Sequence, residues 1–183
     1  MTTESPRERL LRTANELFYR EGINSVGVDR ILSEAGVTRQ TMYRHFAGKE
    51  ALVVAHLELE DRTIRGYFDA ASAQASDPKD LMRLIVEGIA ADATTYHTRG
   101  CPFINAAAEF PDPESPVRAV VDAHRAWFRD TLAHAAKQAG RRDPKRVAAA
   151  LVLLRDAALV GVYLDDPKIV ARAFKDTALT LVT

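Results

Sequence analysis

Apolar residues recur at intervals of three and four along most of the chain, which is the spacing of one face of an α-helix. In residues 25–50 this spacing predicts two short helices joined by a tight turn. The apolar positions of the first are Val28, Ile31, Leu32 and Ala35. Gly36 ends that helix, because glycine adopts a left-handed conformation at little cost. Thr38 can cap the second helix, whose Met42 and Phe46 should hold it against its neighbours.

The rest of the chain has the same helical periodicity, and no strand-like alternation of useful length occurs. Pro and Gly residues mark where the helices begin and end. Ser5 and Pro6 begin a helix that ends at Gly22, and further helices are expected at about 50–75, 81–96, 102–109, 116–139, 144–164 and 167–181. The fold class is therefore all-α, with about nine helices.

The outward face of the second short helix carries groups suited to DNA. These are Arg39, Gln40, Tyr43 and Arg44, with His45 at the edge. Guanidinium and amide groups pair with base edges, and hydroxyl and cationic groups bind phosphates. Alternatively, the charged residues form an ordinary solvated helix face. We favour the DNA interpretation because a helix, a Gly turn and a second short helix precede them in one register.

These residues resemble the tetracycline-repressor (TetR) family of bacterial transcription regulators. The similarity covers about the first fifty residues and consists of Ala14, Leu17, Phe18 and Gly22, then Ala35-Gly36-Val37-Thr38, Tyr43-Arg44-His45-Phe46 and Lys49-Glu50-Ala51-Leu52. Two positions depart from the family pattern. Gly27 stands where Ser or Thr usually caps the first short helix, and Gln40 stands where a small residue is common.

The resemblance implies a three-helix DNA-binding domain at 1–49 and a helical effector-binding and dimerisation domain at 50–183. It also implies a homodimer formed by the last two helices and an unknown small-molecule effector. Within this DNA-binding domain, called the reader below, we expect Arg39 and Gln40 to contact base edges and His45 to support them. For phosphates we expect Thr38, Tyr43, Arg44 and Lys49. The protein would then be an effector-released repressor on a near-palindromic operator of double-stranded DNA, although the family also contains activators.

The formal net charge of the 183 residues is zero, which is unusual for a DNA-binding protein. The distribution of charge is more favourable, because residues 38–49 contain Arg39, Arg44 and Lys49 and no acid. We expect no apolar span of about eighteen residues, hence no transmembrane helix, and the start MTTESPRERLLR has no apolar signal region. These features predict a cytoplasmic protein. The single cysteine, Cys101, excludes an internal disulfide framework.

Polar and aromatic residues in the C-terminal region are candidates for an effector pocket. Cys101, Asn105 and Glu109 are spaced four apart, so they share one face in a helical register. The remaining candidates are aromatic: Tyr96, Trp127, Phe128 and Tyr163. The alternative is that the polar groups bond neighbouring backbone or an Arg and that the aromatics are core residues.

Two further features have competing explanations. Arg155 and Asp156 interrupt the most apolar helix, so we expect them to form an internal ion pair or to lie at the dimer interface rather than to contact ligand. His97, Cys101 and Glu109 are the best material for an enzyme or a metal site, but no third orienting group is evident. We therefore expect neither catalysis nor a metal or cofactor.

Overall fold

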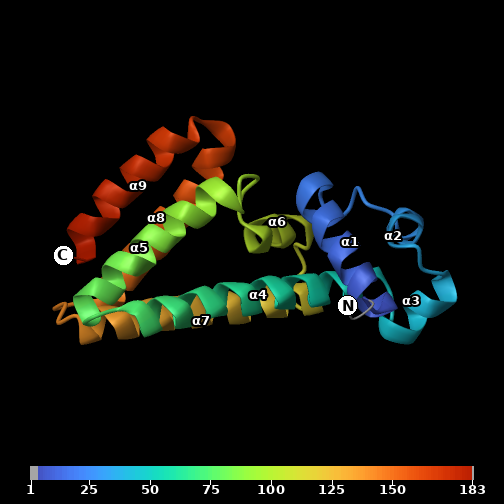
Figure 1. Cartoon of the computed structure of the whole chain (residues 1–183), viewed down its shortest axis with the longest axis horizontal. Coiled ribbons are helices and arrows are strands. Elements are labelled where there is room, and N and C mark those ends of the chain that lie inside the picture. The colour runs from blue at the N-terminus through green and yellow to red at the C-terminus, as the bar shows by residue number, and fades with distance from the viewer. Residues whose placement is uncertain (1–3, 183) are drawn as a thin grey trace. The chain divides into compact units, whose positions relative to one another are not determined.

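The computed structural model describes residues 4–182, and within them it contains nine helices and no strand. The predicted all-α fold class is confirmed (Figure 1). The helices are α1 (Pro6–Glu21), α2 (Val28–Ala35), α3 (Arg39–His45), α4 (Lys49–Gln74), α5 (Pro78–Thr95), α6 (Pro102–Glu109), α7 (Pro116–Gln138), α8 (Pro144–Leu164) and α9 (Pro167–Val182). The cytoplasmic prediction relied in part on the segment MTTESPRERLLR, and its first three residues lie outside the described residues.

Local capping explains where the N-terminal helices begin and end. Ser5 accepts a hydrogen bond from the Glu8 backbone N–H, and the Glu8 side chain accepts one from the Ser5 N–H, which together form a capping box. Gly36 ends α2 in the left-handed conformation, with φ 62° and ψ 41°. Thr38 caps α3 by accepting from the Thr41 N–H at 3.2 Å. The caps at Ser5 and Thr38 and the end of α2 at Gly36 were expected from the sequence, whereas the contribution of Glu8 was not.

The contacts divide the chain into two compact units. The first contains the chain up to Asp61 together with Pro102–Val121, and the second contains Arg62–Cys101 and the chain from Asp122 onward. Helix α6 thus belongs to the unit that contains α1 to α3, and α4 and α7 each contribute residues to both units. The functional division at residues 49 and 50 remains a prediction, because it concerns roles rather than contacts.

In the first unit, α1 packs against both α2 and α3. Apolar residues from all three helices are fully or almost fully excluded from solvent: Leu10, Ala14, Leu17, Ile31 and Met42. Leu52 from the start of α4 is also fully buried. Burying a large apolar side chain contributes about 1.5–3 kcal/mol, so this core can hold the short helix α3, which would not be stable alone.

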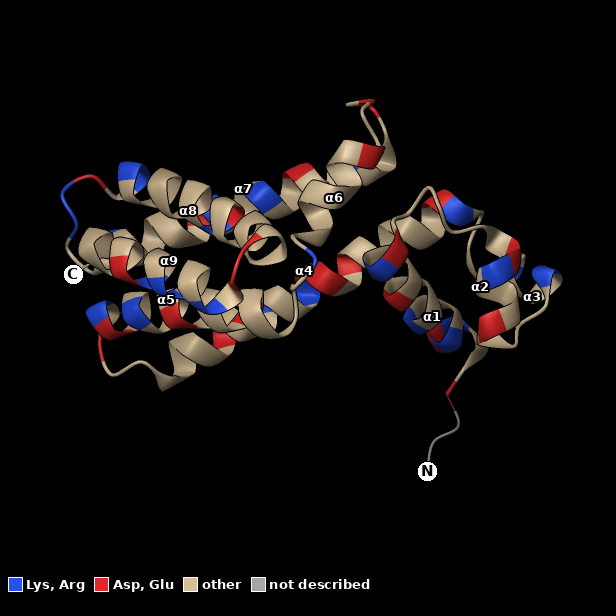
Figure 2. Cartoon of the chain, turned by 90° about the horizontal axis from the view of Figure 1, so that it is seen from above, with Lys and Arg blue, Asp and Glu red and all other residues tan. Residues whose placement is uncertain are grey.

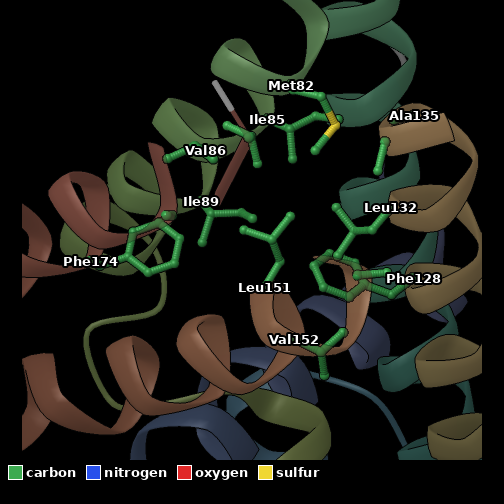
Figure 3. Close-up of a cluster of buried hydrophobic side chains, with 14 of the residues drawn as sticks. Met82, Ile85, Val86, Ile89, Phe128, Leu132, Ala135, Leu151, Val152 and Phe174 are labelled. Atoms are coloured by element: carbon green, nitrogen blue, oxygen red, sulfur yellow. The ribbon is translucent and has the colours of Figure 1, made fainter. Parts of the chain in front are cut away.

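In the second unit, α5, α8 and α9 pack against one another, and apolar residues of α7 complete their core. Figure 3 shows this core, in which Met82, Ile85 and Ile89 of α5 face Phe128 and Leu132 of α7 and residues of α8. From α8 the core contains Ala148, Leu151, Val152 and Ala158.

Helix α8 comes closest to an apolar span of about eighteen residues, although Arg155 and Asp156 interrupt it. Among the described helices, α8 is long and apolar enough to cross a membrane by length and composition. The physical reason is that the helix is apolar nearly all round, because one side fills the core of the second unit while residues on another side, such as Leu153, remain exposed.

Candidate nucleic-acid interface and ligand pocket

Helix α3 is fixed to the first unit by two buried side chains. Met42 is fully buried, and Phe46, which ends the helix, is 5% exposed. The Phe46 ring also lies beneath the guanidinium of Arg7, whose central carbon is 5.3 Å from the ring centroid. These contacts determine which face of α3 is turned toward solvent.

The opposite face of α3 is exposed and basic. Arg39, Gln40, Tyr43, Arg44 and His45 are all exposed. Helix α3 contains no Asp or Glu, and Figure 2 shows only basic charge on it. The face therefore presents guanidinium, amide, phenol and imidazole groups together, which are the groups that bind phosphates and base edges.

Two neighbours modify this face. The Thr38 hydroxyl donates to the Thr41 hydroxyl at 2.9 Å in addition to capping α3, so it is already engaged at both ends. The guanidinium of Arg39 forms an ion pair with Asp29 on α2. Both partners are exposed, so the ion pair is easily exchanged for another partner.

Lys49 begins α4 and is partly buried. Burial lowers the pKa of its ammonium group, and the nearby carboxylate of Glu109 acts in the opposite direction. Glu109, at the end of α6, accepts hydrogen bonds from the backbone N–H groups of Ile23 and Asn24 at 2.9 and 2.5 Å. Those two residues belong to the turn between α1 and α2. Glu109 therefore links α6 to the segment that leads into the helix-turn-helix.

The second unit contains a cavity of about 450 Å³. It is lined mainly by one face of α4 and one face of α5, together with Tyr96, Phe128 and Arg155. Aromatic rings form much of the wall: Tyr67 stacks on Tyr96 with centroids 6.3 Å apart, and Phe68 meets Phe128 edge-on at 5.6 Å. A cavity of this size is within the range that encloses drug-sized molecules.

Two polar side chains, one buried and one partly buried, line this apolar cavity. The Asp92 side chain is 16% exposed and accepts a hydrogen bond from His97 Nδ1 at 2.7 Å through Oδ2. Arg155 is 5% exposed, and its Nη1 donates to Cys101 Sγ at 3.2 Å and to Asp156 Oδ1 at 3.1 Å. Burial alone would lower the pKa of the Arg155 guanidinium, but Cys101 and Asp156 outweigh it and the pKa is raised. Arg155 therefore stays charged.

Sequence profiles of known families match both halves of the chain. Residues 10–56 match the bacterial regulatory proteins of the tetR family, and residues 78–176 match a tetracyclin repressor-like C-terminal domain. The chain belongs to the tetR family. The predicted family membership is confirmed, as is the role of a helix-turn-helix transcription regulator, since DNA-binding regulation is what this family does.

Individual relatives agree with this assignment. A TetR-family transcriptional regulator from Streptomyces coelicolor is 42% identical, with a TM-score of 0.93 over 97% of this chain and 94% of that one. The HTH-type transcriptional regulator YxaF of Bacillus subtilis is 27% identical over 62% of this chain, and LmrA from the same organism is 26% identical over 69%. The match spans 61% of YxaF and 69% of LmrA.

Of the residues predicted to bind an effector in this TetR-family chain, the structure places Tyr96 and Phe128 in the cavity wall. Cys101 lies one contact away, behind Arg155. The wall does not include Asn105, Glu109, Trp127 or Tyr163. Glu109 instead contacts the α1–α2 turn, and the half-exposed Tyr163 lies near the end of α8. Any contact of these residues with ligand stays untested.

Sequence reasoning missed Tyr67, Phe68, Gly88 and Asp92 as wall residues. A signal existed, because 64, 67, 68 and 71 on α4 and 85, 88, 89 and 92 on α5 repeat at helical spacing. Arg155 and Asp156 form the internal ion pair that was one of the two expected outcomes, and Asp156 also accepts from Arg125 at 2.8 Å. Arg155 also lines the cavity, which was the less favoured alternative.

The residues considered for an enzyme or a metal site form hydrogen bonds with other residues. His97 Nδ1 bonds to Asp92, and the Cys101 sulfur accepts from Arg155. Glu109 belongs to the other unit. Across residues 4–182, no group of three or more His, Cys, Asp or Glu side chains could hold a metal ion.

Proposed function

We propose that the protein is an effector-released repressor that binds a near-palindromic operator as a homodimer. The observation that carries this proposal is the exposed basic face of α3, which is held in place by the buried Met42 and Phe46. A helix presented in this way after a tight turn fits the major groove of DNA.

Each exposed group of the reader has an expected role. Gln40 and Arg39 contact base edges, because amide and guanidinium groups can form paired hydrogen bonds with them. Tyr43, Arg44 and Lys49 bind phosphates, and Thr38 adds a phosphate contact when its hydroxyl rotates away from Thr41. His45 supports this face from the C-terminal end of α3.

Dimerisation through α8 and α9 is supported by an exposed apolar stripe. Leu153, Val160 and Leu164 of α8 are 70%, 42% and 69% exposed, and Ile169 of α9 is 68% exposed. The three α8 positions recur at helical spacing, so they lie on one side of the helix. A second copy would cover this stripe, and two-fold symmetry would place two α3 helices in successive major grooves about one turn apart.

Effector control would use the cavity of the second unit. Helix α4 supplies cavity residues from Ile64 to Gln74 and begins at Lys49 in the reader, so one helix serves both functions. If one conformation of the protein binds DNA poorly, a ligand that prefers this conformation raises its population and so lowers the affinity for DNA. Occupying a promoter in the absence of effector would then repress transcription.

The first test is selection of bound fragments from a random duplex library with purified protein and no added ligand. We expect enrichment of a two-fold symmetric motif. A lack of enrichment even at low salt would contradict the proposal and favour a ligand-binding protein whose helix-turn-helix no longer reads DNA.

Variants then assign the roles on the selected duplex and on a scrambled one. Arg44→Ala and Lys49→Ala should weaken binding to both duplexes and each reduce the slope of log affinity against log salt by about one. Gln40→Ala should mainly reduce the difference in binding free energy between the selected and the scrambled duplex, by about 1–3 kcal/mol. Unchanged affinity in all three variants would contradict the assignment of α3 as the reader.

A further inference from the structure

The chemistry of the cavity wall identifies a class of ligand, an inference that rests on the proposed function of the cavity as the effector site. We propose that the cavity binds a flat aromatic cation that donates an N–H hydrogen bond to Asp92. Three features of the wall support this ligand: a buried acceptor, aromatic faces, and an excess of acidic over basic groups.

The acceptor is Asp92 Oδ1. It is buried in the cavity wall and accepts no hydrogen bond from any residue that the structure describes. Its partner oxygen, Oδ2, is held by His97 Nδ1. The imidazole N–H donates that bond, so Oδ1 is the carboxylate oxygen left without a donor within residues 4–182. A buried carboxylate oxygen without a donor is costly, and a ligand N–H would remove this cost.

The aromatic residues give the cavity ring surfaces that attract cations. Tyr67, Phe68, Tyr96 and Phe128 all line it. The faces of aromatic rings carry partial negative charge and attract cations, and they also bury the apolar surface of a flat ligand.

The charges around the cavity favour a cation over an anion. Asp92 and Glu87 are the acidic residues of the wall, and Arg155 is its basic residue. Arg155 shares Asp156 with Arg125, and its guanidinium lies 5.2 Å from the centroid of the Phe128 ring. Glu87 forms an exposed ion pair with Arg83 at 2.8 Å. Asp92 is therefore the acidic residue of the wall that has a buried carboxylate oxygen without a donor among the described residues.

The test uses four probes that share the three-ring acridine skeleton but differ in charge. Each is titrated into the full-length protein without DNA, and binding is followed by ligand fluorescence. The probes are 9-aminoacridine, a cation with N–H donors; 10-methylacridinium, a cation without them; acridone, a neutral donor; and acridine-9-carboxylate, an anion. We expect 9-aminoacridine to bind at least about tenfold more tightly than acridone or acridine-9-carboxylate. The affinity of 10-methylacridinium should be lower than that of 9-aminoacridine and higher than that of the other two probes. Equal or tighter binding of the neutral or anionic probe would overturn the proposal.

Three variants locate the site. Asp92→Asn should remove the preference for 9-aminoacridine over acridone, whereas Asp130→Asn, which removes the same charge from an exposed position of α7, should preserve it. Gly88→Leu should weaken all probes alike, because Gly88 lines the cavity and a Cβ there meets no atom within 4 Å. A preference that survives Asp92→Asn, or probe binding that Gly88→Leu leaves unchanged, would overturn the proposal.

Thermal unfolding followed by circular dichroism shows whether each variant is folded. Should Asp92→Asn not fold, the probe series on the natural chain and on Gly88→Leu still decides the question. DNA selection separates this inference from the proposed function. An enriched operator without cation preference would overturn only the ligand class, whereas cation preference without any enriched DNA would overturn only the regulator.

Discussion

At the scale of single residues, a basic group on the exposed face of α3 is paired with an acid on α2. Asp29 is 84% exposed and pairs with Arg39, which is one of the two residues expected to read bases. In complex with DNA this carboxylate would compete with phosphates and bases for the same guanidinium. The acid is therefore expected to limit affinity for DNA.

Replacing Asp29 by Asn should raise DNA affinity by about threefold to tenfold at low salt and steepen the salt dependence, because Arg39 becomes free and a negative charge is lost. The loss of an acid from the first turn of α2 should cost about 0.3–1 kcal/mol of stability. Fluorescence anisotropy with the selected duplex measures the first effect. The control is Glu34→Gln, which removes an exposed α2 carboxylate that pairs with Arg30. An Asp29→Asn protein that binds DNA no better than this control would contradict the prediction.

The residues that could be read from sequence are those whose role is local. The caps at Ser5 and Thr38, the left-handed Gly36 and the buried Met42 depend only on neighbours within a few positions. The Arg39–Asp29 ion pair joins two helices across ten positions, so its formation depends on how the helices pack. Periodicity alone does not contain that information.

At the scale of helices, α6 has a role that its sequence did not reveal. Its polar residues were interpreted as a pocket wall because they are spaced four apart. In the structure the helix belongs to the first unit, where Glu109 accepts two backbone N–H groups from the α1–α2 turn. The carboxylate also lies near Gly22, where a Cβ would be 3.4 Å from Oε1. Helix α6 is thus a brace for the turn before α2.

Replacing Glu109 by Ala should leave the Ile23 and Asn24 N–H groups without their partner and cost about 1–3 kcal/mol of stability. We also expect weaker DNA binding in the absence of ligand, because the turn that positions α2 loosens. Chemical denaturation and anisotropy measure the two effects. Glu114→Ala is the matched control, since it removes an exposed Glu from the α6–α7 connection. A variant as stable as the control would show that the brace contributes little.

Helix positions were predictable because Pro, Gly and capping residues lie at nearly every boundary. The expected ranges at 102–109 and 144–164 agree with α6 and α8, and the long connector differs from α4 by one residue at each end. The cavity wall could be predicted only in part. Tyr96 and Phe128 were identified as aromatic residues, whereas Asp92 is significant only because packing buries its Oδ1 in the wall.

At the scale of the whole molecule, the proposed dimer through the exposed apolar stripe of α8 would explain how a chain of zero net charge acts on DNA. A dimer doubles the number of α3 faces, each with its local basic patch, while the remaining surface stays balanced in charge. Once one half-site is bound, the second α3 of the dimer is held at a high effective concentration near the other half-site. This raises the overall affinity if the spacing of the half-sites matches that of the two helices. Specific binding should therefore depend steeply on dimerisation.

Leu153→Arg tests this dependence. Leu153 is 70% exposed, so the monomer should tolerate an arginine there. In a two-fold dimer, however, the substitution would remove an apolar contact and bring two positive charges together at the interface. We expect analytical ultracentrifugation to show a shift from dimer to monomer. Affinity for a full palindromic site should fall at least about tenfold, while that for a half-site changes little. Gln138→Arg adds the same charge at an exposed position of α7 and should behave as the natural chain does. A Leu153→Arg protein that remains dimeric would place the interface elsewhere, and a monomer that binds the full site normally would separate DNA recognition from dimerisation.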